Sequence, residues 1–186
     1  MSNPADIVFD HISHERFLAD IEALACKIED AAGASGGWRP DFLVGIGRGG
    51  LVPGAFLSHR TGIPLLSIDH SSKVYDFAQG LLLRIAECSA RGERYLFIDD
   101  INDSGKTLAH MRSTLADSGG ALGNVRFAVL IDNASSCTRV DYASRTIDRA
   151  TDKDWFVFPW EAVAPREVLA EEAMEDPDRL SLGAHE

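Results

Sequence analysis

The sequence is poor in the features that mark secreted and membrane-spanning proteins. It has three cysteines, Cys26, Cys88 and Cys137, which are odd in number and far apart. Because no Cys-x-x-Cys pair occurs, neither a disulfide framework nor a cysteine metal site is expected. No apolar run approaches the roughly 20 residues of a membrane span, and the first ten residues lack the pattern of a signal peptide. These absences predict a cytoplasmic protein without a membrane partner.

Basic side chains are also scarce. The chain of 186 residues has 18 Lys and Arg against 29 Asp and Glu, a formal net charge of -11. A nucleic-acid partner is disfavoured, because binding to phosphate backbones needs a basic face. Residues 161–186 alone hold eight acids and two bases. We therefore expect residues 1–160 to form one domain and residues 161–186 to be an acidic tail, helical from about 165 to 174.

The apolar pattern alternates between strand and helix periods. Apolar strand-like runs occupy residues 41–47, 63–68, 95–98 and 125–131, with a shorter run at 155–158. Helical spacing occurs at residues 14–32 after the N-cap candidate Ser13, at 51–59 and at 106–115. Residues 71–94 are the least regular, and we expect an excursion there with a minor strand at 81–85. This alternation predicts an α/β fold with an open, mostly parallel sheet flanked by helices.

Two of the predicted strands end in unusual residues. Glycines surround Arg48 after the first strand, so the backbone there could approach an anion beside a guanidinium group. The alternative is an ordinary tight turn with a solvated arginine. After the third strand come Asp99 and Asp100, then the small residues 103–105 before a helix. Ribose hydroxyls or hydrated Mg²⁺ would suit such paired carboxylates, and a helix N-terminus suits phosphate. Simple N-capping by Asp103 or Ser104 would explain one residue but not the acid pair.

Nucleotide-binding motifs of other kinds fit poorly. The Gly-Lys-Thr triplet at 105–107 lacks the earlier glycine of a P-loop, because Asp100 stands in its place. The spacing of Gly45, Gly47 and Gly50 matches a dinucleotide fingerprint, but no acid follows in a matching strand at the expected distance. A nucleoside triphosphatase and a dinucleotide enzyme are both disfavoured.

Three segments resemble one family. Residues 95–108 resemble the motif for 5-phosphoribosyl 1-pyrophosphate (PRPP) of type I phosphoribosyltransferases: an apolar strand, two acids, two variable residues, then Asp-Ser/Thr-Gly and a threonine. Residues 48–54 and 154–161 are similar to the first-strand loop and the Trp-x-x-x-Pro-Trp-acid segment of the bacterial xanthine-guanine branch. The resemblance covers about residues 8–161. It implies the type I phosphoribosyltransferase fold over residues 1–160, with a small hood and a mobile loop near 71–76.

The resemblance also implies an activity and a set of site residues. The enzyme would transfer the phosphoribosyl group of PRPP to a purine base of the guanine, xanthine or hypoxanthine type, releasing pyrophosphate, with Mg²⁺ as cofactor and as a dimer or tetramer. Asp103 would be the general acid or base, with Arg48 and the loop residue Lys73 also catalytic. PRPP would be bound by Arg48, Gly49, Asp99, Asp100, Asp103, Ser104, Gly105, Lys106 and Thr107. The metal would be held by Asp99 and Asp100, directly or through water, and the base by Trp155, Phe156 and Asn133. A strained cis peptide is also implied on one side of Arg48.

Two positions depart from the family pattern. The xanthine-guanine branch has a lysine that donates to the 6-oxo group of the purine where this chain has Asn133. An amide can donate to an oxo group or accept from an amino group. An enzyme for a 6-aminopurine or a deazapurine is therefore an alternative, as is a PRPP-binding regulator without catalysis. Asn102 replaces the usual apolar residue, with no consequence that the sequence reveals.

Overall fold

The computed structural model describes residues 7–34, 37–69 and 75–174, with the backbone alone for residues 75–78. It has two compact units, the larger one formed by residues 19–147 and the smaller one by residues 1–18 and 148–186. Helix α1 (His14–Gly33) begins in the smaller unit and continues into the larger one. None of the helices in the described ranges combines the length and apolar character needed to cross a bilayer.

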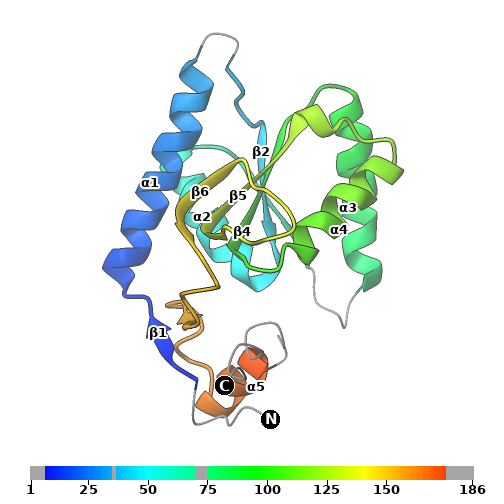
Figure 1. Cartoon of the computed structure of the whole chain (residues 1–186). Helices are drawn as coiled ribbons and strands as arrows, with labels where there is room; N and C mark the ends of the chain where they lie inside the picture. The colour runs from blue at the N-terminus through cyan, green and yellow to red at the C-terminus, as the bar shows by residue number, and fades with distance from the viewer. Residues whose placement is uncertain (1–6, 35–36, 70–74, 175–186) are drawn as a thin grey trace. The chain divides into compact units, whose positions relative to one another are not determined.

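The larger unit is built on a parallel sheet of five strands in the order β3-β2-β4-β5-β6 (Figure 1). Its strands are β2 (Phe42–Ile46), β3 (Leu65–Ile68), β4 (Tyr95–Asn102), β5 (Val125–Asn133) and β6 (Tyr142–Ile147). The chain adds β3 on one side of β2 and then β4, β5 and β6 on the other side. The direction of winding therefore reverses between β2 and β4, and open α/β sheets bind ligands beyond the strand ends at such a point.

Helices cover both faces of this sheet. Figure 1 shows α3 (Tyr75–Ala90) and α4 (Lys106–Asp117) on one face, with α1 and α2 (Gly47–Thr61) on the other. The core under α3 and α4 contains Phe97 of β4 and Phe127 of β5, whose rings stack with centroids 5.2 Å apart. Leu96 and Ile98, which alternate with Phe97 along β4, are fully buried as well. Burial on both faces explains why these strands have continuous apolar sequences.

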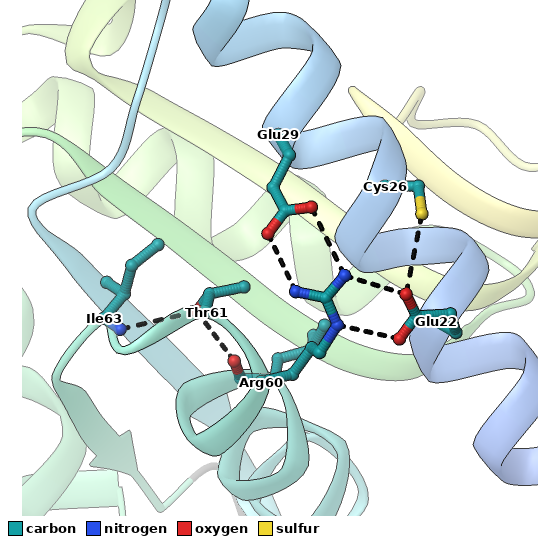
Figure 2. A network of polar contacts seen from close by, with 7 residues as sticks. Glu22, Cys26, Glu29, Arg60, Thr61 and Ile63 are labelled. Carbon is teal, nitrogen blue, oxygen red and sulfur yellow. Dashed lines mark hydrogen bonds and ion pairs between the residues drawn. The ribbon is translucent and has the colours of Figure 1, made fainter.

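A cluster of charged side chains joins α1 to α2 (Figure 2). Arg60 donates to both carboxylate oxygens of Glu22 and to Glu29, with its shortest N–O distances at 2.8 Å. Cys26 lies one turn after Glu22 and contacts its carboxylate at 3.8 Å. These side chains are solvent-exposed, so they add orientation to the helix pair more than stability.

The smaller unit contains a pair of short parallel strands, β1 (Phe9–His11) and β7 (Trp155–Val157), and helix α5 (Arg166–Met174). Trp160 is half-buried, stacks on Phe158 at a centroid distance of 4.8 Å and meets the edge of Phe17. Ser13 accepts a hydrogen bond from the backbone N–H of Arg16 at 3.2 Å, which confirms it as the N-cap of α1.

The α/β fold with an open parallel sheet is confirmed, and three local predictions need correction. Residues 81–85 lie inside α3 and not in a strand, because Leu82, Ile85 and Ala86 bury one helical face. The run at 155–158 forms β7, outside the five-stranded sheet. The fifth strand of that sheet is β6, which the sequence analysis missed because this edge strand, Tyr-Ala-Ser-Arg-Thr-Ile, has few apolar residues.

Candidate active site

The turn after β2 meets the second half of β4, which continues to Asn102 and therefore includes Asp99 and Asp100, predicted to follow the strand. β2 pairs with β4 in parallel with Gly45 opposite Ile98, so the chain leaves β2 beside this acid pair. A Cβ atom added to Gly49 would lie 2.5 Å from Oδ2 of Asp100, and one added to Gly50 would overlap the carbonyl oxygen of Ile98. Only glycine permits this approach. The structure therefore brings together the two segments that the sequence analysis singled out.

Asp99 and Asp100 form a pair of half-buried carboxylates at this edge. Asp99 Oδ1 accepts from the N–H of Asp100 at 3.0 Å, and Asp100 Oδ1 accepts from the N–H of Ile101 at 2.7 Å. Burial, and next the negative charge of Asp100, raise the pKa of Asp99 well above its ordinary value. Such a pair is stabilised by ligands that bring hydroxyl donors or positive charge.

Residues 103–105 connect β4 to α4, whose first residues are Lys106 and Thr107, and the connection ends in a glycine with a left-handed backbone. Gly105 has φ 84° and precedes the helix, and no side chain caps the helix closely. The nearest approach is Ser104 Oγ, which accepts from the N–H of Lys106 over 3.5 Å. Lys106 is exposed, whereas Asp103, Ser104 and Thr107 are half-buried. Tight N-capping therefore does not account for these residues, and a helix N-terminus of this kind is suited to an anion.

Arg48 is the second residue of α2 and is exposed to solvent. The preceding Gly47 has φ 55°, so the sharp exit from β2 uses the left-handed conformation that glycine tolerates. No cis peptide bond occurs among the described residues, and the expected cis peptide beside Arg48 is wrong. The left-handed glycine turns the chain there instead.

Asn133 is the last residue of β5 and is buried, with 5% of its surface exposed. Its amide nitrogen lies 3.1 Å from the carbonyl oxygen of Asp103 and 3.4 Å from its Oδ1. The sequence analysis noted Asn102 but did not predict its two buried side-chain partners next to Asn133, Asp132 and Ser136. The unusual amide at Asn102, in a run that is otherwise apolar or acidic, was the signal that could have found them.

The other predicted site residues lie elsewhere in the chain. Trp155 and Phe156 belong to β7 of the smaller unit, where Trp155 is half-buried and the Arg149 guanidinium lies 4.9 Å from the centre of the Phe156 ring. Lys73, and the predicted mobile loop around it, fall outside the described residues except for the backbone of Tyr75 and Asp76. Within the described ranges, no group of three or more His, Cys, Asp or Glu side chains is arranged to hold a metal ion.

These features define a class of protein: an α/β protein with a candidate anion site at the winding reversal of a parallel sheet, where an acid pair and a helix N-terminus follow each other along the chain. Residues 10–164 match the phosphoribosyl transferase domain, and the chain belongs to this family.

Individual relatives agree with this assignment. The chain is 29% identical to the xanthine-guanine phosphoribosyltransferase of Cereibacter sphaeroides over 157 residues, which is 81% of this chain and 86% of that one. Two solved structures share the fold. The purine phosphoribosyltransferase of Pyrococcus horikoshii has a TM-score of 0.59 and 24% identity, over 82% of this chain and 94% of that one. The xanthine-guanine-hypoxanthine enzyme of Helicobacter pylori has a TM-score of 0.58 and 23% identity, over 82% and 93%.

Proposed function

We propose that this protein transfers the 5-phosphoribosyl group of PRPP to a purine base of the guanine, xanthine or hypoxanthine type and releases pyrophosphate. The observation that carries the proposal is the convergence of the Arg48 turn on the Asp99–Asp100 pair of β4, three residues before the segment 103–107 that leads into α4. PRPP is a sugar with phosphate groups at both ends, so its site needs acceptors for the ribose hydroxyls between two places that bind anions. The acid pair lies between the turn after β2 and the start of α4 and meets this requirement. The xanthine-guanine relative supports the choice of a purine.

In this proposal the three parts of PRPP have separate binding groups. The 5-phosphate lies at the N-terminus of α4, held by main-chain N–H groups and side chains of residues 103–107. The ribose hydroxyls donate to Asp99 and Asp100. The pyrophosphate lies at the turn after β2, where Arg48 supplies charge-assisted donors and Gly49 lets the backbone come close.

The acid pair also fits Mg²⁺. This ion binds through one or two carboxylates together with substrate phosphates and water, so it needs no cluster of three protein ligands. Burial, and next the charge of Asp100, raise the pKa of Asp99, and a cation beside the pair would offset the second of these causes. Asp99 and Asp100 would hold it, directly or through water. When bound, Mg²⁺ supplies positive charge that favours departure of the pyrophosphate.

Cleavage at the anomeric carbon builds positive charge on the ribose while negative charge grows on the leaving pyrophosphate. Arg48 stabilises the departing charge, and the carboxylates position the ring. Asp103 takes or returns the proton of the purine imidazole nitrogen as general base or acid. The charged ribose must be shielded from water during transfer, and in this proposal Lys73 and the loop near residues 71–76 close over it. Trp155 stacks on the base with Phe156 beside it, and Asn133 is the third base-binding candidate.

The direct test supplies purified protein with PRPP and Mg²⁺ and, in separate reactions, guanine, xanthine, hypoxanthine, adenine and a deazapurine, and detects each nucleotide by mass. We expect a 6-oxopurine nucleotide and stoichiometric pyrophosphate, both lost when a chelator removes Mg²⁺. Asp117→Asn, at the far end of α4, serves as the control substitution. PRPP binding without a product from any base would leave the regulator as the better description.

The same proposal includes domain bounds, a cellular compartment and an oligomeric state. The catalytic domain takes residues 1–160, and the acidic tail begins at residue 161 and includes α5. Cys26, Cys88 and Cys137 are free thiols, which suits the reducing cytoplasm. A homo-oligomer, dimer or tetramer, is expected, and light scattering on the purified protein measures its mass.

A further inference from the structure

The ends of β4 and β5 are joined by amide side chains that reach across in both directions. In the strand register Asn102 stands opposite Asp132. Asn102 Nδ2 donates to Asp132 Oδ1 and to the carbonyl oxygen of Thr138, each at 2.7 Å. Asn102 Oδ1 accepts from Ser136 Oγ at 3.1 Å. Every polar atom of this buried amide is therefore used to fix loop 134–138 beside β4.

Asn133 reaches in the opposite direction, from β5 to the residue that follows β4. The backbone N–H of Ser135 donates to Asn133 Oδ1 at 3.1 Å. Because an N–H group can only donate, this bond requires the amide oxygen on the Ser135 side and the amide nitrogen on the other side. The nitrogen thus faces two acceptors of one residue, the carbonyl oxygen and Oδ1 of Asp103.

The loop that orients Asn133 is itself held against the PRPP loop. The N–H of Cys137 donates to the carbonyl oxygen of Ser104 at 3.2 Å. A Cβ atom on Gly105 would collide with Ser136 Oγ and would lie 2.8 Å from the backbone nitrogen of Thr138. These contacts hold the loop that carries Ser135, the donor to Asn133 Oδ1, against the segment that begins with Asp103.

We propose that Asn133 is a positioning residue that acts through Asp103: its amide holds the Asp103 carboxylate in the orientation for proton transfer, and Asn102 with Asp132 keeps the two strand ends in register for that contact. This inference rests on the proposed function. Asn133, which stands where the xanthine-guanine branch has a lysine, would then act without direct contact with the purine.

The sharpest test is Asn133→Asp, which keeps the shape and the acceptor for the Ser135 N–H but replaces the donor to Asp103 with a second carboxylate. Asn133→Ala removes both. We expect kcat to fall on the order of tenfold or more in each variant, the scale of one lost hydrogen bond to a charged group. KM for PRPP and for the base should change less than about threefold, because a positioning role gives Asn133 no contact with either substrate. If Asn133→Ala does not fold, Asn133→Ser takes its place.

A double-mutant cycle separates positioning from a merely structural role. In an Asp103→Ala background, Asn133→Ala should change kcat by less than about threefold, because the group it positions is gone. Asn124→Ala is the matched control: its amide donates to the Ser89 carbonyl oxygen at 2.9 Å, just before β5 begins. It should leave kcat unchanged.

Two results would overturn the inference. If the effects of the Asn133 and Asp103 substitutions on kcat multiply in the double variant, Asn133 is a structural residue. If the single variants change the ratio of guanine to adenine use, Asn133 contacts the base directly. A wild-type protein that forms no nucleotide with any base would refute the proposed function itself, which is a different outcome.

Discussion

Gly49 and Asp100 lie so close that a methyl group on the glycine would overlap the carboxylate, with the added Cβ 2.5 Å from Oδ2. The contact joins the turn after β2 to the acid pair of β4. Since a carboxylate can rotate away, Gly49→Ala should retain the fold while turning Asp100 out of its place. We expect PRPP affinity to fall roughly tenfold or more with little change in Tm, measured by calorimetry and thermal unfolding.

Gly50→Ala and Gly123→Ala are the controls for Gly49→Ala. A Cβ at Gly50 would collide with the main chain at Ile98, which cannot rotate away, so Gly50→Ala should lower Tm strongly. Gly123 has open space around it, and Gly123→Ala should affect neither stability nor binding. Normal PRPP affinity in Gly49→Ala would show that PRPP binding does not depend on the close placement of Asp100 against Gly49.

Asp99 should make stability depend on pH. Its pKa in the folded protein is raised, so the folded state holds the proton more tightly than the unfolded chain. Its favourable contribution is present below the ordinary pKa, near 4, and is lost as pH rises through the raised value. Asp99→Asn should therefore have a higher Tm than the wild type at neutral pH, and the difference should vanish in acid.

The same substitution should weaken binding of Mg²⁺ and PRPP, because it removes a charge aimed at hydroxyls or the metal shell. Thermal unfolding from pH 4 to 8 and calorimetry at pH 7.5 measure the two effects. A Tm that is equal for both proteins throughout would show that Asp99 carries no burial penalty. Normal affinity for PRPP would remove the residue from the site.

Asp103→Asn tests the acid–base role. Losing a general acid or base lowers kcat by about 10²-fold or more, whereas PRPP should still bind because the amides of α4 remain. Steady-state kinetics and calorimetry give the two quantities. Turnover that is unchanged with every accepted base would exclude Asp103 from proton transfer.

Arg60→Ala tests whether the exposed cluster between α1 and α2 matters (Figure 2). Hydrogen bonds from Arg60 lower the pKa of Glu22, so the pair contributes most at neutral pH and loses its contribution as Glu22 is protonated in acid. Exposed ion pairs are weak and screened by salt. We expect a small decrease in Tm that disappears at high salt, with unchanged transferase activity. A large decrease in Tm that persists at high salt would mean that this charged cluster stabilises the packing of α1 on α2.

How far the sequence alone determines this protein can be judged at particular residues. The buried strands and the chemistry after them are local patterns, because a strand covered on both faces must be apolar and acids at its end must find partners. Asp99, Asp100 and the start of α4 were predictable on that basis. β6 was not, since an edge strand is half-exposed and its sequence shows little periodicity.

The tertiary structure alone decided which strand ends meet. Pairing of β2 with β4 brings Gly49 to Asp100, although about fifty residues separate them along the chain. The β4–β5 register sets Asn102 opposite Asp132 and turns the Asn133 amide to Asp103. A hydrogen bond depends on the direction of its donor as well as on residue type. The sequence marked Asn133 as a site candidate, and the packing of the strands set the direction of its amide.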